Sequence, residues 1–337
     1  MIRIAIDAMG GDLAPDAIIS GAVASLKMVE DTRLDLYGPE SLLREKLKAY
    51  SYDTDRITVN DAPEVISLHE SPVMAIRRKK DSSIVRALRA VKENEADAFL
   101  SAGSSGAILA GGQLIVGRGD NIQRAPLGAL IPTKKGICLL LDCGANVDAK
   151  PEWLVQFAKM GAIYMREVVG VRNPSVGLVN IGAEEEKGNA LVKETMPMLR
   201  ACQDLNFIGS CEARDIVDGS CDIVVCDAFV GNCVMKMYEG VGSMLLSEVK
   251  GVIKSNLLTM LGGMMIAGSL KKTLVRFDAK RYGGAPVLGL KGLVVKVHGN
   301  TDGSEIGYAI RQCVDFVKAD VTEKIISAMR ADNEKEN

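Results

Sequence analysis

The chain has 337 residues, of which 47% are hydrophobic and 25% are charged, and its formal net charge is −2. These values are typical of a globular protein with a large core. With so little net charge and only 4% aromatic residues, the chain lacks the excess cations and stacking rings of a general nucleic-acid-binding protein.

The eight cysteines include no C-x-x-C pair, so we expect neither a zinc site nor a disulfide framework, and no metal. Residues 1–7 have a strand pattern and lack the basic and apolar regions of a signal peptide. We therefore expect a cytoplasmic protein.

The first part of the chain predicts alternating strands and helices, with strands at 2–6, 34–37 and 57–59 and helices at 15–29 and 41–49. Gly10 and Gly11 follow the first strand and precede a helix. Such a turn can bind an anion through its backbone N–H groups, although the spacing is not that of a dinucleotide fingerprint.

The most basic cluster of the chain consists of Arg77, Arg78, Lys79 and Lys80. It is either a solvated face of a helix or a surface that receives an acidic partner.

A strand at 98–100 then leads into a loop of small residues that includes Gly103, Ser104, Ser105 and Gly106. Backbone amides and hydroxyl groups in such a loop suit phosphate oxygens, but the tight packing of a helix on a sheet selects the same residues.

Two further strands, at 126–131 and 136–142, end in a glycine turn that contains Asn146, and a helix is predicted at 151–168. The next strand, at 176–179, ends at Asn180, and Lys187 follows in a loop before a helix. Ligands bind at such strand ends in open α/β sheets. Lys187 either offsets the carboxylates at 184–186 in an exposed loop or serves a negatively charged substrate as a point charge.

A strand at 222–226 delivers Asn232 to the start of a long helix that extends through residue 249. The Asn232 amide either caps this helix or orients a carbonyl group.

Residues 255–270 carry no charge and are fewer than the roughly 20 residues of a transmembrane helix. Gly262 and Gly263 predict a division into two short apolar helices, within a hairpin at about residues 251–272. These helices are either buried in the core or exposed, and exposed helices would contact a membrane and cover an acyl chain. The candidate contacts are Leu257, Leu258, Leu261, Met264 and Met265.

The apolar run at 287–297 leads to His298, a further candidate for phosphate contact, and then to two final helices. Residues 331–337 are polar and predict a C-terminal tail with little order.

Seven segments carry a resemblance to a known family: AIDAMGGD (5–12), HESPVMAIRRKKDSSI (69–84), SAGSSGA (101–107), DCGAN (142–146), NIGAEEEKGN (180–189), CDAFVGN (226–232), and YGGAPVLGLKG followed by HGN. In this order they resemble the phosphate acyltransferases of bacterial phospholipid synthesis, from Ile2 to about residue 330. The resemblance implies one domain over 1–330 with a Rossmann-like three-layer α/β/α sandwich, similar to isocitrate and isopropylmalate dehydrogenases. It also implies a homodimer with the active site near its interface.

The function implied by the resemblance is transfer of a fatty acyl group from acyl-acyl carrier protein to inorganic phosphate, without a cofactor. The resemblance assigns essential roles to Lys187 and Asn232. The acidic acyl carrier protein would dock on the basic cluster at 77–80, and acyl-phosphate would be released at the inner face of the cell membrane to a glycerol-3-phosphate acyltransferase.

Three alternatives remain open at this stage. A thiol could form an acyl-enzyme, which requires a thiolate beside a base, and the chain has only two histidines. A metal- and NAD-dependent dehydrogenase on the same fold would need clustered aspartates and a cofactor loop. A non-enzymatic lipid-binding scaffold would depend on residues 255–270 alone.

Overall fold

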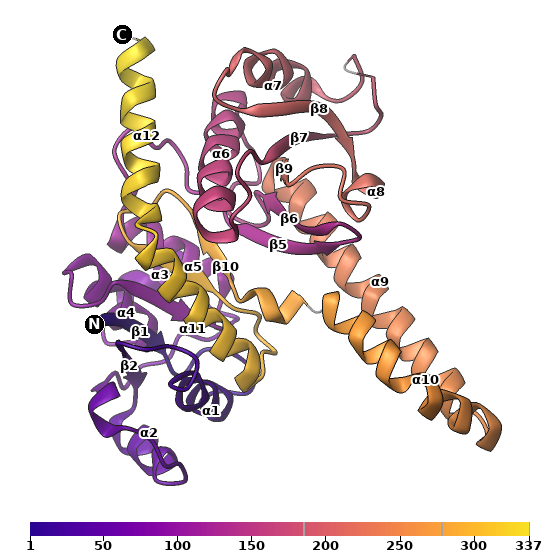
Figure 1. Ribbon diagram of the computed structural model, residues 1–337. Helices are drawn as coiled ribbons and strands as arrows, with labels where there is room; N and C mark the ends of the chain where they lie inside the picture. Colours follow the sequence, from indigo (N-terminus) through magenta and orange to yellow (C-terminus); the bar gives the residue numbers. More distant parts are fainter. Residues whose placement is uncertain (185, 278, 337) are drawn as a thin grey trace.

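The computed structural model describes residues 1–184, 186–277 and 279–336. Two α/β lobes lie side by side, and a helical hairpin projects from their junction (Figure 1). The first lobe contains the N-terminal strands and also β10, β11 and α11, so the chain leaves this lobe and later returns to it.

The first lobe is built on a six-stranded sheet with the strand order β10-β11-β4-β1-β2-β3. The β10–β11 pair is antiparallel and the other pairs are parallel. The strands are β1 (Ile2–Asp7), β2 (Thr32–Gly38), β3 (Ile57–Asp61), β4 (Ala98–Ser101), β10 (Ala285–Val287) and β11 (Leu293–Lys296). The helices around them are α1 (Asp16–Ser25), α2 (Glu40–Leu47), α3 (Pro72–Arg78), α4 (Ser83–Lys92), α5 (Ser105–Gly111) and α11 (Gly303–Lys318).

The alternation of side chains along β1 places a helical layer on each face of this sheet. Ile4 and Ile6 are buried in a cluster with residues of α1 and α11, whereas Ala5 is buried in a cluster with residues of α4 and α5. Successive strand residues point to opposite faces, so the lobe has three layers.

The second lobe contains a five-stranded sheet with the order β5-β6-β9-β7-β8, in which only the β5–β6 pair is antiparallel. Its strands are β5 (Gly128–Thr133), β6 (Gly136–Leu141), β7 (Ser175–Asn180), β8 (Asn206–Glu212) and β9 (Ile223–Val225). The helices are α6 (Pro151–Tyr164) and α7 (Ala190–Ala201) on one face, and α8 (Ala213–Ile216) and the start of α9 (Ala228–Lys254) on the other. The predicted α/β class, with sheets covered by helices, is confirmed.

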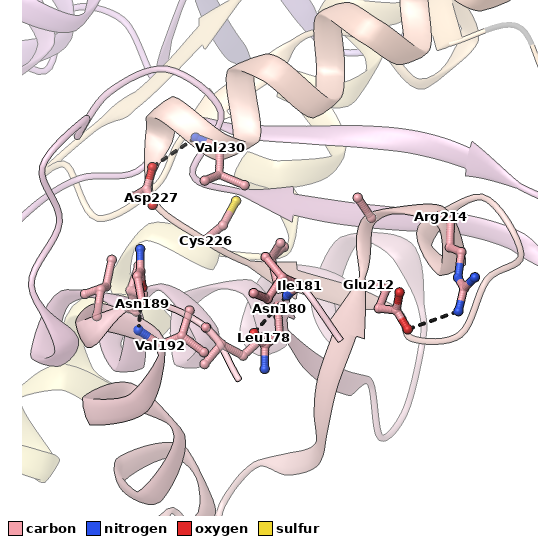
Figure 2. A pocket seen from close by; sticks show the side chains of 15 residues that line it. Leu178, Asn180, Ile181, Asn189, Val192, Glu212, Arg214, Cys226, Asp227 and Val230 are labelled. Atoms are coloured by element: carbon pink, nitrogen blue, oxygen red, sulfur yellow. Dashed lines mark hydrogen bonds and ion pairs between the residues drawn. The ribbon is translucent and has the colours of Figure 1, made fainter. Parts of the chain in front are cut away.

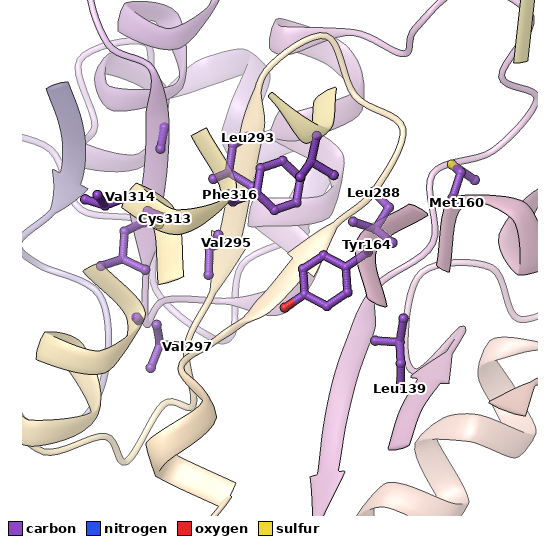
Figure 3. Close-up of a cluster of buried hydrophobic side chains, with 14 of the residues drawn as sticks. Leu139, Met160, Tyr164, Leu288, Leu293, Val295, Val297, Cys313, Val314 and Phe316 are labelled. Carbon is purple, nitrogen blue, oxygen red and sulfur yellow. The ribbon is translucent and has the colours of Figure 1, made fainter. Parts of the chain in front are cut away.

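The two lobes meet in a buried cluster of aromatic and aliphatic side chains (Figure 3). Tyr164 of α6 lies with its ring centroid 6.0 Å from that of Phe316 in α11. The Gln312 side-chain amide donates to the Tyr164 hydroxyl at 2.9 Å and to the Gly284 carbonyl at 3.0 Å, and its carbonyl accepts from Gly284 N at 2.8 Å. Tyr164, Gln312 and Gly284 therefore join α6 of the second lobe to α11 and to the segment before β10 in the first lobe.

The hairpin consists of α9 and α10 (Leu257–Arg276). The expected division at Gly262 and Gly263 was wrong, because α10 continues unbroken through both glycines. The turn lies instead at Ser255 and Asn256, and the Asn256 side chain caps α10. A Cβ atom at Gly263 would lie 2.5 Å from Ile253 Cγ2, so glycine is needed where the two helices cross.

Two helices end in π-helical turns. α5 continues as a π-helical turn, η2 (Gly112–Val116), and α6 as another, η3 (Met165–Val169). Each turn ends at a glycine with φ of 85°, Gly117 and Gly170, which is a conformation that favours glycine. The remaining elements are η1 (Thr54–Arg56), η4 (Ala279–Tyr282) and α12 (Val321–Glu336). α12 extends through the expected C-terminal tail as far as Glu336.

Candidate active site

The larger of two cavities has a volume of about 1750 Å³ and extends from the hairpin to the junction of the lobes. Its long walls are apolar and come from β5, α9 and α10. In α10 the lining residues Met260, Gly263, Met264 and Ala267 recur at helical spacing, so one face of this helix borders the cavity. The cavity is therefore suited to a long apolar group.

One end of this cavity is polar. It is lined by Glu239 of α9 and by Lys280, Lys296, His298, Asn300 and Glu305 of the first lobe. His298 Nε2 lies 3.3 Å from a Glu239 carboxylate oxygen. This hydrogen bond raises the pKa of His298 above 6.5, and in turn it lowers the pKa of Glu239. The pair links α9 to the loop after β11.

Three loops of the first lobe meet beside His298, because they follow the adjacent parallel strands β1, β4 and β11. Asp12 N donates to Gly299 O at 2.7 Å, and Val297 N donates to Ser101 O at 2.8 Å. The fold thus brings together the predicted phosphate-binding loops that contain Gly10 and Gly11, Gly103 to Gly106, and His298.

Many of the small residues in these loops have packing roles. Asp7 is fully enclosed, and it accepts from the Ser101 hydroxyl at 2.6 Å and from Met9 N at 3.1 Å. A Cβ atom at Gly10 would lie 2.5 Å from the Asp7 carboxylate. Gly103 N donates to Ser101, so its N–H is already engaged.

The next residues of the same loop also contact the protein itself. The Ser104 hydroxyl caps α5, and a Cβ atom at Gly106 would lie 2.6 Å from Pro72 Cγ. Among the four residues predicted from this loop, Ser105 is exposed. These contacts favour a structural role for Gly103, Ser104 and Gly106 over the predicted phosphate contact.

A smaller cavity of about 760 Å³ lies in the second lobe, at the carboxyl ends of β7 and β9 (Figure 2). Gly188 and Asn189 of the loop before α7 line one side, and Asp227 and Val230 line the other. Lys187 directly precedes the first pair. Its amino group pairs with Glu184 at 2.8 Å, and its side chain is 51% exposed.

Asn232 lies in the first turns of α9, between residues that line the two cavities. Val230 borders the smaller cavity and Cys233 the larger one. In the described part of the chain, no hydrogen bond joins the Asn232 side chain to Lys187 or to any other residue. The Asn232 amide is therefore available to a ligand.

Two other predicted asparagines are engaged by the protein. The Asn146 side chain donates to Asp142 at 2.7 Å and to Ala125 O at 3.1 Å. The Asn180 side chain accepts from Ile181 N at 2.8 Å and donates to Ser210 at 3.0 Å. Both are buried and hold the loops after β6 and β7 in place, and Asn180 also lines the smaller cavity.

Two of the cysteines at these cavities, Cys143 and Cys226, are poor nucleophiles. Cys143 lines the larger cavity and Cys226 the smaller one. Burial raises the pKa of both thiols, which disfavours the thiolate that an acyl-enzyme would need. Their Sγ atoms lie near backbone carbonyls, at 3.1 Å from Leu127 O and 3.8 Å from Asp142 O.

Sequence reasoning missed Glu239, Lys296 and Glu305. Lys296 ends the apolar stretch Leu293–Val295. A lone charge in a buried strand could have indicated a functional residue. Glu239 and Glu305 lie in helices whose sequences give no sign of what they face.

Within residues 1–184, 186–277 and 279–336, no group of three or more His, Cys, Asp or Glu side chains is arranged to hold a metal ion. None of the helices in these ranges combines the length and the apolar character needed to cross a bilayer.

Solved structures place the fold among the phosphotransacylases. A phosphotransacetylase from Streptococcus pyogenes matches with a TM-score of 0.61 at 14% identity over 94% of each chain. EutD phosphotransacetylase from Staphylococcus aureus matches with a TM-score of 0.59 at 14% identity, also over 94% of each. A 4-hydroxythreonine-4-phosphate dehydrogenase from Klebsiella pneumoniae gives 0.52 at 15% identity, over 94% of this chain and 100% of the other. At such identities the likeness establishes the fold alone.

Sequence relatives define the family. The family model described as "Fatty acid synthesis protein" matches residues 2–324. The phosphate acyltransferase of Clostridium perfringens is 48% identical over 337 residues, covering 99% of each chain. That of Halothermothrix orenii is 46% identical over 334 residues, covering 99% of this chain and 100% of the relative. The chain belongs to the phosphate acyltransferase family and is an acyltransferase. Of the functional classes that the sequence left open, the acyltransferase is the one that these relatives confirm.

The His298–Glu239 pair gives a prediction for titration. Glu239→Gln should lower the pKa of His298, because the bond to the carboxylate is the main cause of its elevation. In the wild type both partners are charged between the lowered pKa of Glu239 and the raised pKa of His298, and the charged pair is lost as the pH rises through the latter. NMR titration of the imidazole C–H signals of His298 measures this directly. An unchanged midpoint in the variant would show that Glu239 does not control this histidine.

Proposed function

We propose that this acyltransferase transfers a fatty acyl group from acyl-acyl carrier protein to inorganic phosphate, giving acyl-phosphate for phosphatidic acid synthesis. The observation that carries the proposal is the 1750 Å³ cavity, apolar along the hairpin and polar at the junction of the lobes. An acyl chain would lie against the apolar walls, with its thioester toward the polar end. The proposal includes a homodimer in the cytoplasm at the inner face of the membrane.

The chemistry is direct attack of a phosphate oxygen on the thioester carbonyl. A C–O bond forms, the C–S bond breaks, and the thiol of the carrier arm departs. Phosphate is already a nucleophile and a thiolate is a good leaving group, so the protein needs mainly to align the reactants and stabilise the oxyanion. Lys187 would neutralise charge that develops in the transition state, and Asn232 would donate to the carbonyl oxygen.

The Lys187–Glu184 pair is compatible with this role. The ion pair is exposed, so it is screened by solvent and contributes little to holding the lysine in place. Release from Glu184 would let the flexible side chain turn toward a bound anion.

Lys187→Ala should lower turnover by roughly 10²–10³, the range found when one group that stabilises an oxyanion is removed. Purified protein would be mixed with acyl-acyl carrier protein and phosphate, and acyl-phosphate would be quantified by mass spectrometry. Lys193→Ala is the matched control, because Lys193 is an exposed lysine of α7 outside both cavity linings. A Lys187 variant with more than half of wild-type turnover would exclude the assignment, and wild-type protein without acyl-phosphate product would exclude the proposed reaction.

The basic cluster supports docking of an acidic carrier. Arg77, Arg78 and Lys80 are exposed around the end of α3. Lys79 differs, because its amino group pairs with Glu70 at 2.9 Å and donates to Val65 O at 2.7 Å. We therefore assign the docking role to the three exposed cations and a structural role to Lys79.

Arg77→Glu with Lys80→Glu should raise the KM for acyl-acyl carrier protein and flatten its dependence on salt, because exposed charges act mainly on encounter and are screened by ions. Steady-state kinetics at several salt concentrations measures both effects. Lys46→Glu with Lys48→Glu provides a control of equal charge change at the C-terminal end of α2. Kinetics equal to that control would mean that the cluster is only a solvated face.

The hairpin supports contact with a membrane. The outer face of α10 carries Leu257, Leu258, Leu261 and Met265, and Leu258 is 80% exposed. Lys254, Lys271 and Lys272 flank this apolar face and would meet anionic headgroups. Met264, by contrast, lines the cavity, so α10 has one face for the acyl chain and another for the lipid surface. Release of acyl-phosphate there would supply a membrane glycerol-3-phosphate acyltransferase.

Leu258→Glu with Leu261→Glu should abolish sedimentation with vesicles that contain anionic lipid, because two charges would enter the apolar face. Turnover of soluble substrate should be retained, since neither residue lines the described cavities. Leu68→Glu with Leu114→Glu is the control, because both leucines are exposed elsewhere on the protein. Unchanged sedimentation of the hairpin variant would refute the membrane contact.

A further inference from the structure

The polar end of the large cavity contains two charged side chains whose hydrogen-bonding capacity the protein leaves incomplete. The Lys296 side chain makes no hydrogen bond or ion pair with any described residue. Glu305 is only 5% exposed, and its Oε2 atom has no hydrogen-bond partner in the described part of the chain. Both residues line the cavity.

Such an arrangement is costly without a ligand. Buried charges in folded proteins are normally paired, and an unpaired buried carboxylate oxygen loses its hydration without compensation. Burial lowers the pKa of Lys296 and raises that of Glu305, which is the direction expected when each charged form lacks a partner. A polar ligand that offers both an acceptor and a donor would satisfy the two groups together.

The fold holds these groups on rigid elements. Lys296 is the last residue of β11, which pairs with β4 in the middle of the sheet. Glu305 lies in the first turn of α11, whose cap residue Asp302 accepts from Glu305 N at 3.2 Å. The loop between them carries His298 and Asn300, which also line the cavity.

The neighbouring charges are engaged elsewhere. His298 pairs with Glu239, and Lys280 pairs with Asp302 at 3.0 Å. The carboxylates of Glu239 and Glu305 act on Lys296 from a distance, but no described residue forms a direct ion pair with its amino group.

We infer that Lys296 and Glu305 bind the inorganic phosphate acceptor, with Lys296 donating to a phosphate oxygen and Glu305 accepting a hydrogen bond from the P–OH group. This inference rests on the proposed function, because it takes the acceptor to be phosphate. Monohydrogen phosphate carries both kinds of group near neutral pH. Sulfate is an anion of similar shape without a proton to donate, so it would leave Glu305 unpaired and repelled.

The inferred site also accounts for the proton of the reaction. One phosphate oxygen forms the C–O bond to the thioester carbonyl carbon while the C–S bond breaks. The proton of the P–OH group, held by Glu305, ends on the departing sulfur, giving acyl-phosphate and a thiol. Lys296 contacts phosphate before the reaction, so its loss should act on the KM for phosphate, whereas loss of Lys187 should act on kcat.

Lys296→Met should raise the KM for phosphate by about 10- to 100-fold, the equivalent of one hydrogen bond to a charged group. The KM for the acyl donor should not change. Lys291→Met is the matched control, because Lys291 lies in the β10–β11 connection, just before the strand that carries Lys296, and pairs with Asp120 outside the cavity.

Glu305→Gln tests the selectivity. The amide would donate an N–H to sulfate, so the ratio of the sulfate inhibition constant to the phosphate KM should fall by about tenfold or more relative to the wild type. A structural role of Glu305 alone would leave this ratio unchanged. Circular dichroism and thermal unfolding establish that the variants are folded.

Binding of labelled inorganic phosphate, measured by equilibrium dialysis without any acyl donor, separates this inference from the proposed function. Loss of phosphate binding in Lys296→Met supports the site even if another acyl donor proves correct. Folded variants that bind phosphate as the wild type does, with an unchanged sulfate ratio, would overturn the inference while leaving acyl transfer to phosphate intact.

Discussion

The arrangement of the two lobes depends on the buried hydrogen bonds of Gln312. Its amide donates to Tyr164 and to Gly284 O, and its carbonyl accepts from Gly284 N. Removing one partner would leave a buried polar group unpaired, at a cost of about 1–3 kcal/mol. Gly283 adopts a φ of 84°, and a Cβ atom there would lie 2.5 Å from the Gln312 carbonyl oxygen. Gly283 and Gly284 directly precede β10, which pairs with β11. The hydrogen bonds of Gln312 therefore fix the position of the end of β11 relative to the second lobe.

Each lobe also contains a buried aspartate at the carboxyl edge of its sheet. Asp7 gathers the loops after β1 and β4, and Asp142 accepts from Leu127 N, Gly144 N, Ala145 N and the Asn146 amide. In both lobes, backbone N–H groups of a turn that contains glycine donate hydrogen bonds to the buried aspartate. The turn after β6 also borders the larger cavity through Cys143.

The sequence predicted most strands and helices because short apolar runs and helical periodicity are local signals. It did not predict two separate sheets, because strand pairing depends on contacts between distant segments. It placed Lys187 and His298 correctly in loops that follow strands, and Asn232 at the start of a helix. It assigned phosphate contacts to Asn146 and Asn180, whose partners are set by tertiary structure. Lys296 and Glu305 escaped notice because an unpaired state is visible only once the surrounding side chains are in place.

The continuity of α9 gives the hairpin a mechanical role. This helix of 27 residues starts beside the smaller cavity and ends at the hairpin tip. At 1.5 Å per residue its length is about 40 Å. Asn232 lies near one end of this rod, Glu239 lies closer to its middle, and the exposed Leu257 and Leu258 lie beyond the other end. An unbroken helix transmits tilt from one end to the other, so under the proposed membrane contact a surface that fixed the tip would also constrain the directions in which Asn232 and Glu239 point.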